Sequence, residues 1–354
     1  MPGIVSAGTS DAPYAYSQTE LKKLARALFL KKGRDFGRLL DVFENSLIDS
    51  RHFINSAEWF ETPKSFKERS ITYAGNVAAL SIPAIKACVE SAGAGLGDFD
   101  HIIFVTSTGI SAPSADALIL NQLGLDRHVK RTPIWGLGCA GGAAGMSRAF
   151  EYARAFPESA VLLVAAEMCS LAFHDDDYSK SNVVSLALFS DGAAAVLVAG
   201  EKHRLYGKSK VRMTRTLSTT WPDTLGIMGW EVVDDGLRAI FSKEIPSIVR
   251  GRIRENLDEL LGAGDFSVSS LGHFAVHPGG PKVLSEYEAA LGLEEGTFVY
   301  SRKVLRDHGN MSSPTVLYVL KEILDGEDFK EKEYGVISAL GPGFSSELVL
   351  FESA

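Results

Sequence analysis

Short apolar runs alternate with helical stretches along most of this chain, and the alternation occurs twice. In the first half, the apolar runs lie at residues 1–8, 101–106, 132–137, 161–165 and 193–198, with helical stretches at about 17–45, 114–123 and 143–155. In the second half, they lie at 273–276, 297–300, 335–340 and 347–351, with helical stretches at about 244–262, 281–291 and 313–324. This alternation predicts an α/β fold of parallel strands joined by helices. We expect two pseudo-duplicated halves, 1–205 and 206–354, although no repeat is visible letter by letter.

Composition narrows the functional classes. The chain of 354 residues is 45% hydrophobic and has a formal net charge of −8, with no Lys/Arg-rich tract. Nucleic-acid binding is therefore not expected, because it depends on a basic surface. The sequence begins without a signal-peptide pattern and contains no apolar run of about 18 residues, so we expect a cytoplasmic protein without a membrane span. Its three cysteines predict free thiols in a reducing compartment.

Cys139 has the most distinctive surroundings of the three cysteines. It follows the apolar run 132–137 and precedes a Gly/Ala-rich helical stretch. Small residues there suit a buried helix that another backbone approaches closely. A thiol at a helix N-terminus is favoured as thiolate, the nucleophilic form. The alternative is a small core residue, which free cysteines often are, and this segment alone leaves both open. Cys88 lies on an amphipathic stretch and predicts core packing, whereas Cys169 ends an apolar run and predicts a pocket-lining position.

Two further polar residues follow apolar runs or precede a helix. His277 ends the run 273–276 and is followed by Pro-Gly-Gly-Pro, which predicts an imidazole held at a strand end beside a crevice. A structural histidine in a tight turn is the alternative. Asn310 precedes an apolar helical stretch, where it would serve as an N-cap or donate to a developing oxyanion. His174 precedes three aspartates, Asp175 to Asp177, and a solvated acidic loop is favoured there over a metal site.

Five segments in one order resemble the type III polyketide synthases, the chalcone and stilbene synthase family of the thiolase-like superfamily. They are residues 136–142 around Cys139, 188–194, 277–281, 309–313 and 341–344. The residues around Cys139 and the segment 167–171 resemble the bacterial alkylpyrone and alkylresorcinol synthases more than the plant enzymes. The resemblance implies a five-layered αβαβα thiolase-like fold, a homodimer, and an acyltransferase that needs no metal and no cofactor besides CoA thioester substrates.

The resemblance also implies roles for individual residues. Cys139 would take an acyl group from acyl-CoA, and His277 would hold it as thiolate. His277 and Asn310 would bind the thioester carbonyl of malonyl-CoA and stabilise the enolate that decarboxylation produces. Phe189 matches a phenylalanine at the junction of CoA tunnel and cavity. Ser312, in the segment after Asn310, joins the substrate-binding candidates.

Departures from the plant pattern bear on the starter unit. By an ungapped comparison, a second gatekeeping phenylalanine falls at Ala239, two cavity threonines fall at Cys169 and Ala172, and a methionine near the dimer-spanning loop falls at Ala112. Three alanines predict a longer, more apolar cavity and a medium- or long-chain fatty acyl-CoA starter, with an alkylpyrone or alkylresorcinol product. Trp230 replaces a small residue and would shorten the cavity.

CoA recognition is expected at a basic cluster, Lys31, Lys32, Arg34 and Arg38, for which a solvated helix face is the equal alternative. Two other functions compete with the polyketide synthase. One is a ketoacyl-ACP synthase III-like enzyme that performs a single condensation in fatty-acid synthesis. The other is a non-catalytic acyl-CoA-binding scaffold, which the presence of all three triad residues disfavours.

Overall fold

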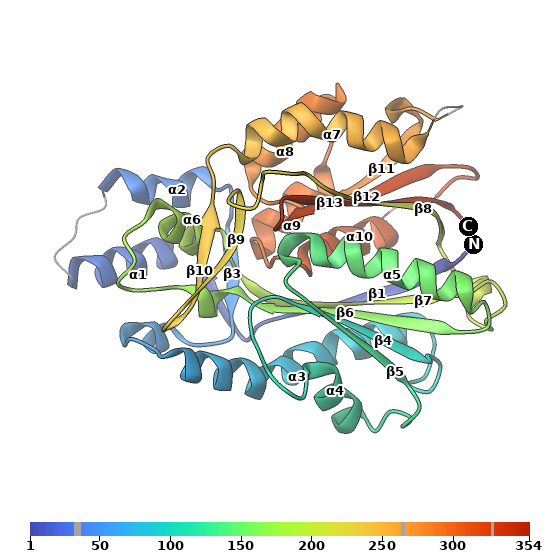
Figure 1. Cartoon of the computed structure of the whole chain (residues 1–354), viewed down its shortest axis with the longest axis horizontal. Helices are drawn as coiled ribbons and strands as arrows, with labels where there is room; N and C mark the ends of the chain where they lie inside the picture. Colours follow the sequence, from blue (N-terminus) through green and yellow to red (C-terminus); the bar gives the residue numbers. More distant parts are fainter. Residues whose placement is uncertain (32–36, 263–265, 327–328) are drawn as a thin grey trace.

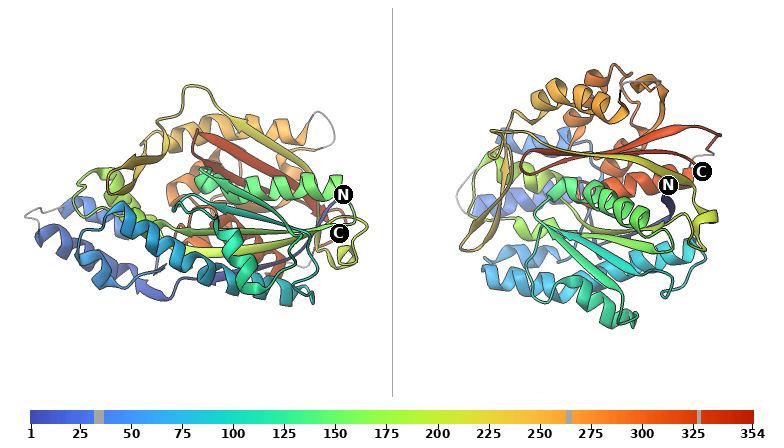
Figure 2. Two further views of the ribbon diagram at one scale, coloured as in Figure 1. Left: turned by 60° about the horizontal axis from the view of Figure 1, so that its bottom comes forward. Right: turned by 45° about the vertical axis from the view of Figure 1, so that its right-hand side comes forward.

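The computed structural model describes residues 1–31, 37–262, 266–326 and 329–354. Five layers stack through most of the molecule (Figures 1 and 2). The first sheet contains, in spatial order, β1 (Gly3–Asp11), β7 (Asp191–Ala199), β6 (Ala160–Met168), β4 (His101–Thr106) and β5 (Lys130–Trp135). The second contains β8 (Val211–Thr220), β13 (Ser345–Ser353), β12 (Tyr334–Gly341) and β11 (Leu271–Val276). The sheets are continuous through a short β1–β8 contact.

Helices fill the other three layers. The outer face of the first sheet is covered by α3 (Phe66–Ser91) and α4 (Ala115–Leu123), and that of the second by α7 (Ile245–Leu261) and α8 (Pro281–Leu291). Between the sheets lie α5 (Gly141–Ala155) and α10 (Thr315–Gly326), and α9 (Val299–His308) contacts α10 and β11. All nine residues of β6 are buried, as expected for a strand covered on both faces. The predicted five-layered αβαβα fold is confirmed.

A group of smaller elements, which we call the cap, lies at the end of the layers opposite the two termini (Figures 1 and 2). Its members are α1 (Gln18–Lys31), α2 (Asp41–Asn45), α6 (Lys180–Leu188) and the two-stranded sheets β2 (Tyr14–Ser17) with β3 (Ser50–Phe53) and β9 (Met228–Val233) with β10 (Gly236–Phe241). The β9–β10 pair is an antiparallel hairpin.

Three expectations about the elements were wrong. The sheets are mixed, because β4 pairs in parallel with β5 and β6 but β7 pairs antiparallel with both β1 and β6. Residues 17–45 do not form one helix: they contain the end of β2, α1, a short 3₁₀ turn (Gly37–Leu40) and α2. The run at 297–300 is not a strand. Its last two residues begin α9, whose Val304 and Leu305 are buried in the core, so tertiary packing overrides the β-propensity of Thr-Phe-Val-Tyr.

The strand β8 was not anticipated, because residues 211–220 alternate in burial on a polar sequence. The proposed division at 205/206 falls in the connection between β7 and β8 and stays a prediction. In the part of the chain that the structure describes, no helix is long and apolar enough to cross a bilayer.

Candidate active site

Cys139 lies on a glycine elbow between β5 and α5. Gly136 and Gly138 adopt φ of +94° and +47°, a region that favours glycine. A Cβ on Gly138 would also lie 2.8 Å from Cδ of Pro342. Both the backbone conformation and this close contact therefore exclude a side chain at position 138. Cys139 follows within a 3₁₀ turn (Gly138–Ala140) directly before α5, and it is buried. The strand–elbow–helix arrangement expected from sequence is confirmed.

The glycines of α5 allow the second half of the chain to approach the nucleophile. A Cβ on Gly142 would lie 2.3 Å from the carbonyl oxygen of Ser313, and one on Gly141 would lie 3.1 Å from Cβ of Ser313. Ser313 belongs to the turn that connects Asn310 to α10. The close backbone approach predicted for this helix is therefore made by the segment that carries Asn310.

Three predicted residues meet at one cavity. Cys139, His277 and Asn310 all line a cavity of about 600 Å³, and all three are buried. His277 follows β11, and its backbone N–H donates to the carbonyl of Ser338 on β12 at 2.8 Å. The Cys139 Sγ lies 4.0 Å from Oδ1 of Asn310. We call these three residues and their turns the triad wall.

Asn310 is oriented by its own turn. Its Oδ1 accepts from the backbone N–H of Ser312 at 2.8 Å, and Ser312 has a φ of +62°. The Asn310 Nδ2 consequently faces the Gly279 carbonyl, 3.5 Å away in the turn that follows His277. Asn310 is thus held by backbone contacts and leaves an amide donor beside His277. Ser312 shapes this turn, and the hydrogen bond from its hydroxyl opposes the rise in the pKa of Cys139.

Burial opposes an isolated charge on either member of the Cys–His pair. It raises the pKa of Cys139 to about 11 and lowers the pKa of His277 to about 3. Neither ring nitrogen of His277 has a hydrogen-bond partner among the described residues. Passing the Cys139 proton to His277 would create both charges together, and each ion would then compensate the other.

Glu167 is a buried acid that the sequence did not single out. Its Oε2 accepts from the Ser107 backbone N–H at 2.8 Å and the Thr108 hydroxyl at 2.7 Å, and its Oε1 accepts from the Ser313 hydroxyl at 2.7 Å. Burial raises the pKa of Glu167 to about 7 despite these donors. The charge of Glu167 in turn helps to raise the pKa of Cys139, after desolvation. A glutamate within the otherwise apolar run 160–168 was the available signal.

Aromatic rings lie where the cap meets the triad wall. The Phe189 ring lies 5.6 Å from that of Phe241 and 5.7 Å from that of Trp230, and the backbone of Phe189 bridges to Asn310. Phe241, on β10, lines the 600 Å³ cavity. Ala239 is buried opposite Trp230 in the hairpin and does not line it. The ungapped comparison therefore selected a residue that does not line this cavity, whereas Phe241, two residues further along β10, lines it. The gatekeeping role of either position stays a prediction.

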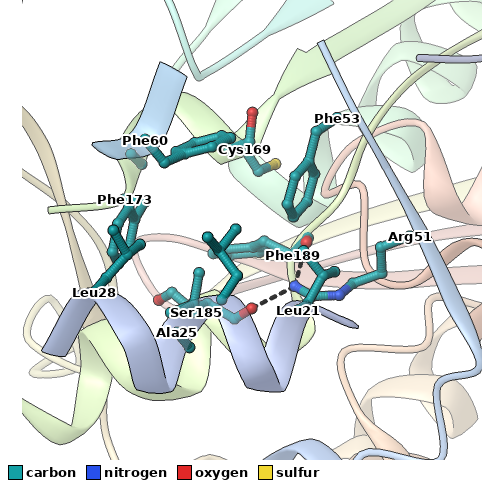
Figure 3. A pocket seen from close by; sticks show the side chains of 14 residues that line it. Leu21, Ala25, Leu28, Arg51, Phe53, Phe60, Cys169, Phe173, Ser185 and Phe189 are labelled. Carbon is teal, nitrogen blue, oxygen red and sulfur yellow. Dashed lines mark hydrogen bonds between the residues drawn. The ribbon is translucent and has the colours of Figure 1, made fainter. Parts of the chain in front are cut away.

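A second, narrow pocket of about 20 Å³ lies behind Phe189 (Figure 3). Its lining is almost entirely apolar and includes Phe189, Cys169 and Ala172, together with side chains of α1 such as Leu21 and Leu28. Cys169 lies close enough to Cys139 for the charge of one to raise the pKa of the other. Arg51 is fully buried beside this pocket and donates to the carbonyl of Phe189 at 2.9 Å.

Ala112 lies outside both pockets. It is exposed, in the loop between β4 and α4. Two of the three alanines used to infer a longer cavity, Ala112 and Ala239, therefore do not line the cavity of this chain, and that inference rests on Ala172.

The structure does not test the basic cluster expected to bind CoA. Lys32 and Arg34 lie outside the described residues, as do the side chains of Lys31 and Arg38. Among the described residues, Lys180, Lys243 and Lys282 line the 600 Å³ cavity, each just before or just inside a helix of the cap or of the outer layer. Isolated lysines in different segments give no sequence cluster, so the sequence analysis missed them.

His174 is a buried structural residue, whereas Asp176 in the acidic run that follows it is exposed and Asp175 and Asp177 are partly exposed. One ring nitrogen contacts Oδ2 of Asp235 at 2.8 Å and the other contacts the carbonyl of Leu237 at 3.0 Å. Both partners lie at the start of β10, so His174 attaches the β9–β10 hairpin to the segment after β6.

The comparisons with known proteins agree with this geometry. Residues 52–202 match the N-terminal domain of chalcone and stilbene synthases, and residues 212–354 match the C-terminal domain. A putative chalcone synthase of Bacillus subtilis (strain 168) is 40% identical, over 99% of this chain and 98% of that protein. A 1,3,6,8-tetrahydroxynaphthalene synthase of Streptomyces peucetius subsp. caesius is 33% identical, over 98% of this chain and 94% of that protein.

The solved structures agree as well. The crystal structure of 1,3,6,8-tetrahydroxynaphthalene synthase from Streptomyces coelicolor A3(2), a bacterial type III polyketide synthase, superposes with a TM-score of 0.92 at 28% identity, covering 99% of both chains. These matches favour the polyketide synthase over the ketoacyl-ACP synthase III alternative and over a non-catalytic scaffold. The chain belongs to the chalcone and stilbene synthase family, and it is a type III polyketide synthase, an acyltransferase that performs decarboxylative condensation.

Proposed function

We propose that this enzyme loads a medium- or long-chain fatty acyl group from acyl-CoA onto Cys139, extends it with malonyl-CoA, and releases an alkylpyrone or alkylresorcinol. The observation that carries the proposal is the meeting of Cys139, His277 and Asn310, all three buried, at one cavity. The substrates are CoA thioesters, and the proposal requires no further cofactor.

Loading begins with proton transfer from Cys139 to His277. The resulting thiolate attacks the acyl-CoA carbonyl, and the CoA thiolate leaves. His277 and the Asn310 Nδ2 then bind the thioester oxygen of malonyl-CoA. Loss of CO₂ leaves an enolate, whose negative oxygen these donors stabilise. The enolate carbon attacks the acyl–Cys139 thioester, the Cys139 thiolate leaves, and the acyl chain is longer by two carbons.

The three lysines that line the cavity suit the binding of CoA. Lys180, Lys243 and Lys282 line the same cavity as Cys139, and CoA carries several phosphate charges. We propose that they bind the phosphates, so Lys243→Ala and Lys282→Ala should each raise the KM for acyl-CoA several-fold and leave kcat little changed. Lys86→Ala, on the outer helix α3, is the matched control. An unchanged KM in both variants would remove these lysines from CoA binding.

The narrow pocket behind Phe189 supports an aliphatic starter. Its apolar side chains suit an alkyl chain, which gains about 0.8 kcal/mol for each buried CH₂. With a volume of about 20 Å³, the pocket must widen around such a chain, and the side chains of α1 line it from the cap side. The small volume of the pocket and the 33% identity to a tetrahydroxynaphthalene synthase favour a second candidate function. In this second candidate, malonyl-CoA is the only substrate and supplies every carbon of the product.

Product analysis separates the two candidates. The enzyme is incubated with malonyl-CoA alone and with a series of straight-chain acyl-CoAs of increasing length, and products are identified by mass spectrometry. Pyrones or resorcinols that retain the acyl chain support the first candidate. An aromatic product formed from malonyl-CoA alone, unchanged by added acyl-CoA, supports the second. A single 3-ketoacyl product would contradict both.

We also propose that the enzyme is a homodimer joined along β5. This strand is the edge of the first sheet, and its last residue, Trp135, and Ile110 in the loop after β4 are about half exposed. They border a cavity of about 320 Å³ that is open on this edge. Light scattering should give twice the chain mass, and Trp135→Lys should shift it toward the mass of one chain. The cytoplasmic location stays a prediction.

A further inference from the structure

Two imidazoles and a carboxylate converge at the junction of β1, β3 and α9, outside the cavity described above. Asp11 ends β1, His52 lies on β3, and His308 ends α9. One potential ligand atom from each residue lies within 4.8 Å of those from the other two. The His52 and His308 rings lie 5.8 Å apart with an interplanar angle of 34°. From this arrangement we propose that Asp11, His52 and His308 bind a divalent first-row transition metal of the Zn²⁺ class.

The state of each ligand suits a metal. The Nδ1 of His52 is buried and has no hydrogen-bond partner among the described residues, and a ring nitrogen of His52 lies within 4.8 Å of ligand atoms of Asp11 and His308. His308 Nδ1 already lies 2.9 Å from Oδ1 of Asp11, so a small opening of this pair would admit an ion between them. Two histidines and one carboxylate are a common set for such metals.

The surroundings of the three ligands also favour a cation. The Tyr318 hydroxyl donates to Oδ1 of Asp11 at 3.1 Å, the kind of outer contact that orients a ligating carboxylate. His308 occupies the C-terminal turn of the ten-residue helix α9, where the helix dipole favours positive charge. An ion there would join the end of α9 to β1 and β3.

The second cluster of this kind in the described residues lacks these properties. His174, Asp176 and Asp235 also bring ligand atoms together. Both ring nitrogens of His174, however, already have partners, and the charge of Arg69 acts on Asp235 and Asp176. A cation would have to displace those partners and tolerate the guanidinium. This cluster therefore serves as an internal control.

The proposed site is connected to Asn310 through Ser190. The Ser190 hydroxyl accepts from the His52 backbone N–H at 2.8 Å and donates to the His52 carbonyl at 3.0 Å, while the Ser190 backbone N–H donates to the Asn310 carbonyl at 2.9 Å. A bound ion would consequently stiffen the support of Asn310 without touching the substrate. The role is structural, and it does not depend on which starter the enzyme uses.

The test is metal binding to the purified full-length enzyme after removal of metals with EDTA. Zn²⁺ is titrated calorimetrically, and Co²⁺ is titrated by visible absorption, which reports the ligand type. We expect one ion per chain, a Co²⁺ spectrum without a sulfur-to-metal band, and a higher Tm with Zn²⁺. Asp11→Asn and His308→Ala should each lower the affinity at least tenfold, and Tyr318→Phe about tenfold. His128→Ala, an exposed histidine beside Arg127, should leave the affinity unchanged.

Several results would overturn the proposal. They are an absence of binding, a sulfur-to-cobalt band that points to Cys139, or loss of the ion in His174→Ala with retention in His308→Ala. Circular dichroism of the EDTA-treated variants shows whether each is folded. Because His308 is at the surface end of its helix and partly exposed, His308→Ala provides a test even where Asp11→Asn fails to fold.

Discussion

The triad wall and the cap differ in how tightly their sequence is constrained. In the triad wall, backbone from both halves of the chain meets with no space for added atoms, as at Gly138 against Pro342 and Gly142 against Ser313. In the cap, short elements contact one another mainly through side chains, such as the rings of Phe189, Trp230 and Phe241. Chemistry thus depends on a backbone arrangement, whereas substrate choice depends on replaceable side chains.

Removing the nucleophile tests the triad wall most directly. Cys139→Ala should abolish extension, because no other thiol described in the structure lies on the cavity with His277 and Asn310. Cys139→Gln should retain some decarboxylation of malonyl-CoA, since the donors for the enolate remain. Both are measured by mass spectrometry, with Cys88→Ala as a control in a thiol that lies in the core. Full turnover by Cys139→Ala would contradict the mechanism.

Removing the base should reduce the reactivity of Cys139 by about 10²- to 10⁴-fold. With His277 present, the positive charge of its protonated ring compensates the negative charge of the Cys139 thiolate. Iodoacetamide should therefore label Cys139 at pH 7 faster than Cys88, because burial raises the pKa of Cys88 to about 12. In His277→Ala the thiol keeps the pKa of about 11 that burial imposes. Its labelling should then be slow at pH 7 and rise about tenfold per pH unit up to pH 10. Identical pH profiles for the two proteins would show that no ion pair forms.

Adding a side chain at Gly142 tests whether the triad wall depends on the close approach of two backbone segments. In Gly142→Ala the new Cβ meets the Ser313 carbonyl oxygen at 2.3 Å, so we expect a loss of about 1–3 kcal/mol in the free energy of unfolding, with a large loss of activity. Gly75→Ala is the matched control in the exposed face of α3, where a Cβ meets nothing within 4 Å. It should gain up to about 1 kcal/mol from helix propensity. Urea unfolding of both variants gives the comparison.

Opening the cap should alter selectivity more than catalysis. Phe241→Ala removes a ring from the mouth of the cavity, and we expect a change of up to about tenfold in relative kcat/KM among acyl-CoA chain lengths, with the fold unchanged. Val232→Ala, an exposed position on the neighbouring strand β9, is the control. Equal loss for every acyl-CoA would instead place Phe241 in the chemistry.

The same contrast explains how far the sequence could be interpreted. β4 at 101–106, α8 at 281–291 and the segments of the triad were predicted from sequence, because a buried strand, a Pro/Gly-bounded helix and a glycine elbow each leave a local signal. Phe241 was not anticipated at the cavity, because the comparison selected Ala239, two residues earlier on the same strand. Glu167 and the three lysines of the mouth come together only through folding. No local pattern marks the lysines, and Glu167 is marked only by its place in the apolar run 160–168. The order of strands in a mixed sheet is equally a long-range property.

Gly142 has a consequence for how members of such a lineage diversify. With the Ser313 carbonyl 2.3 Å from the position of any added Cβ, the helix that bears the nucleophile and the turn that bears Asn310 cannot drift apart independently over generations. Heritable change in product must therefore accumulate elsewhere, in the hairpin and helices around Phe189. A mutational library restricted to those residues should yield many active variants with altered products, and one restricted to residues 136–145 should yield few survivors.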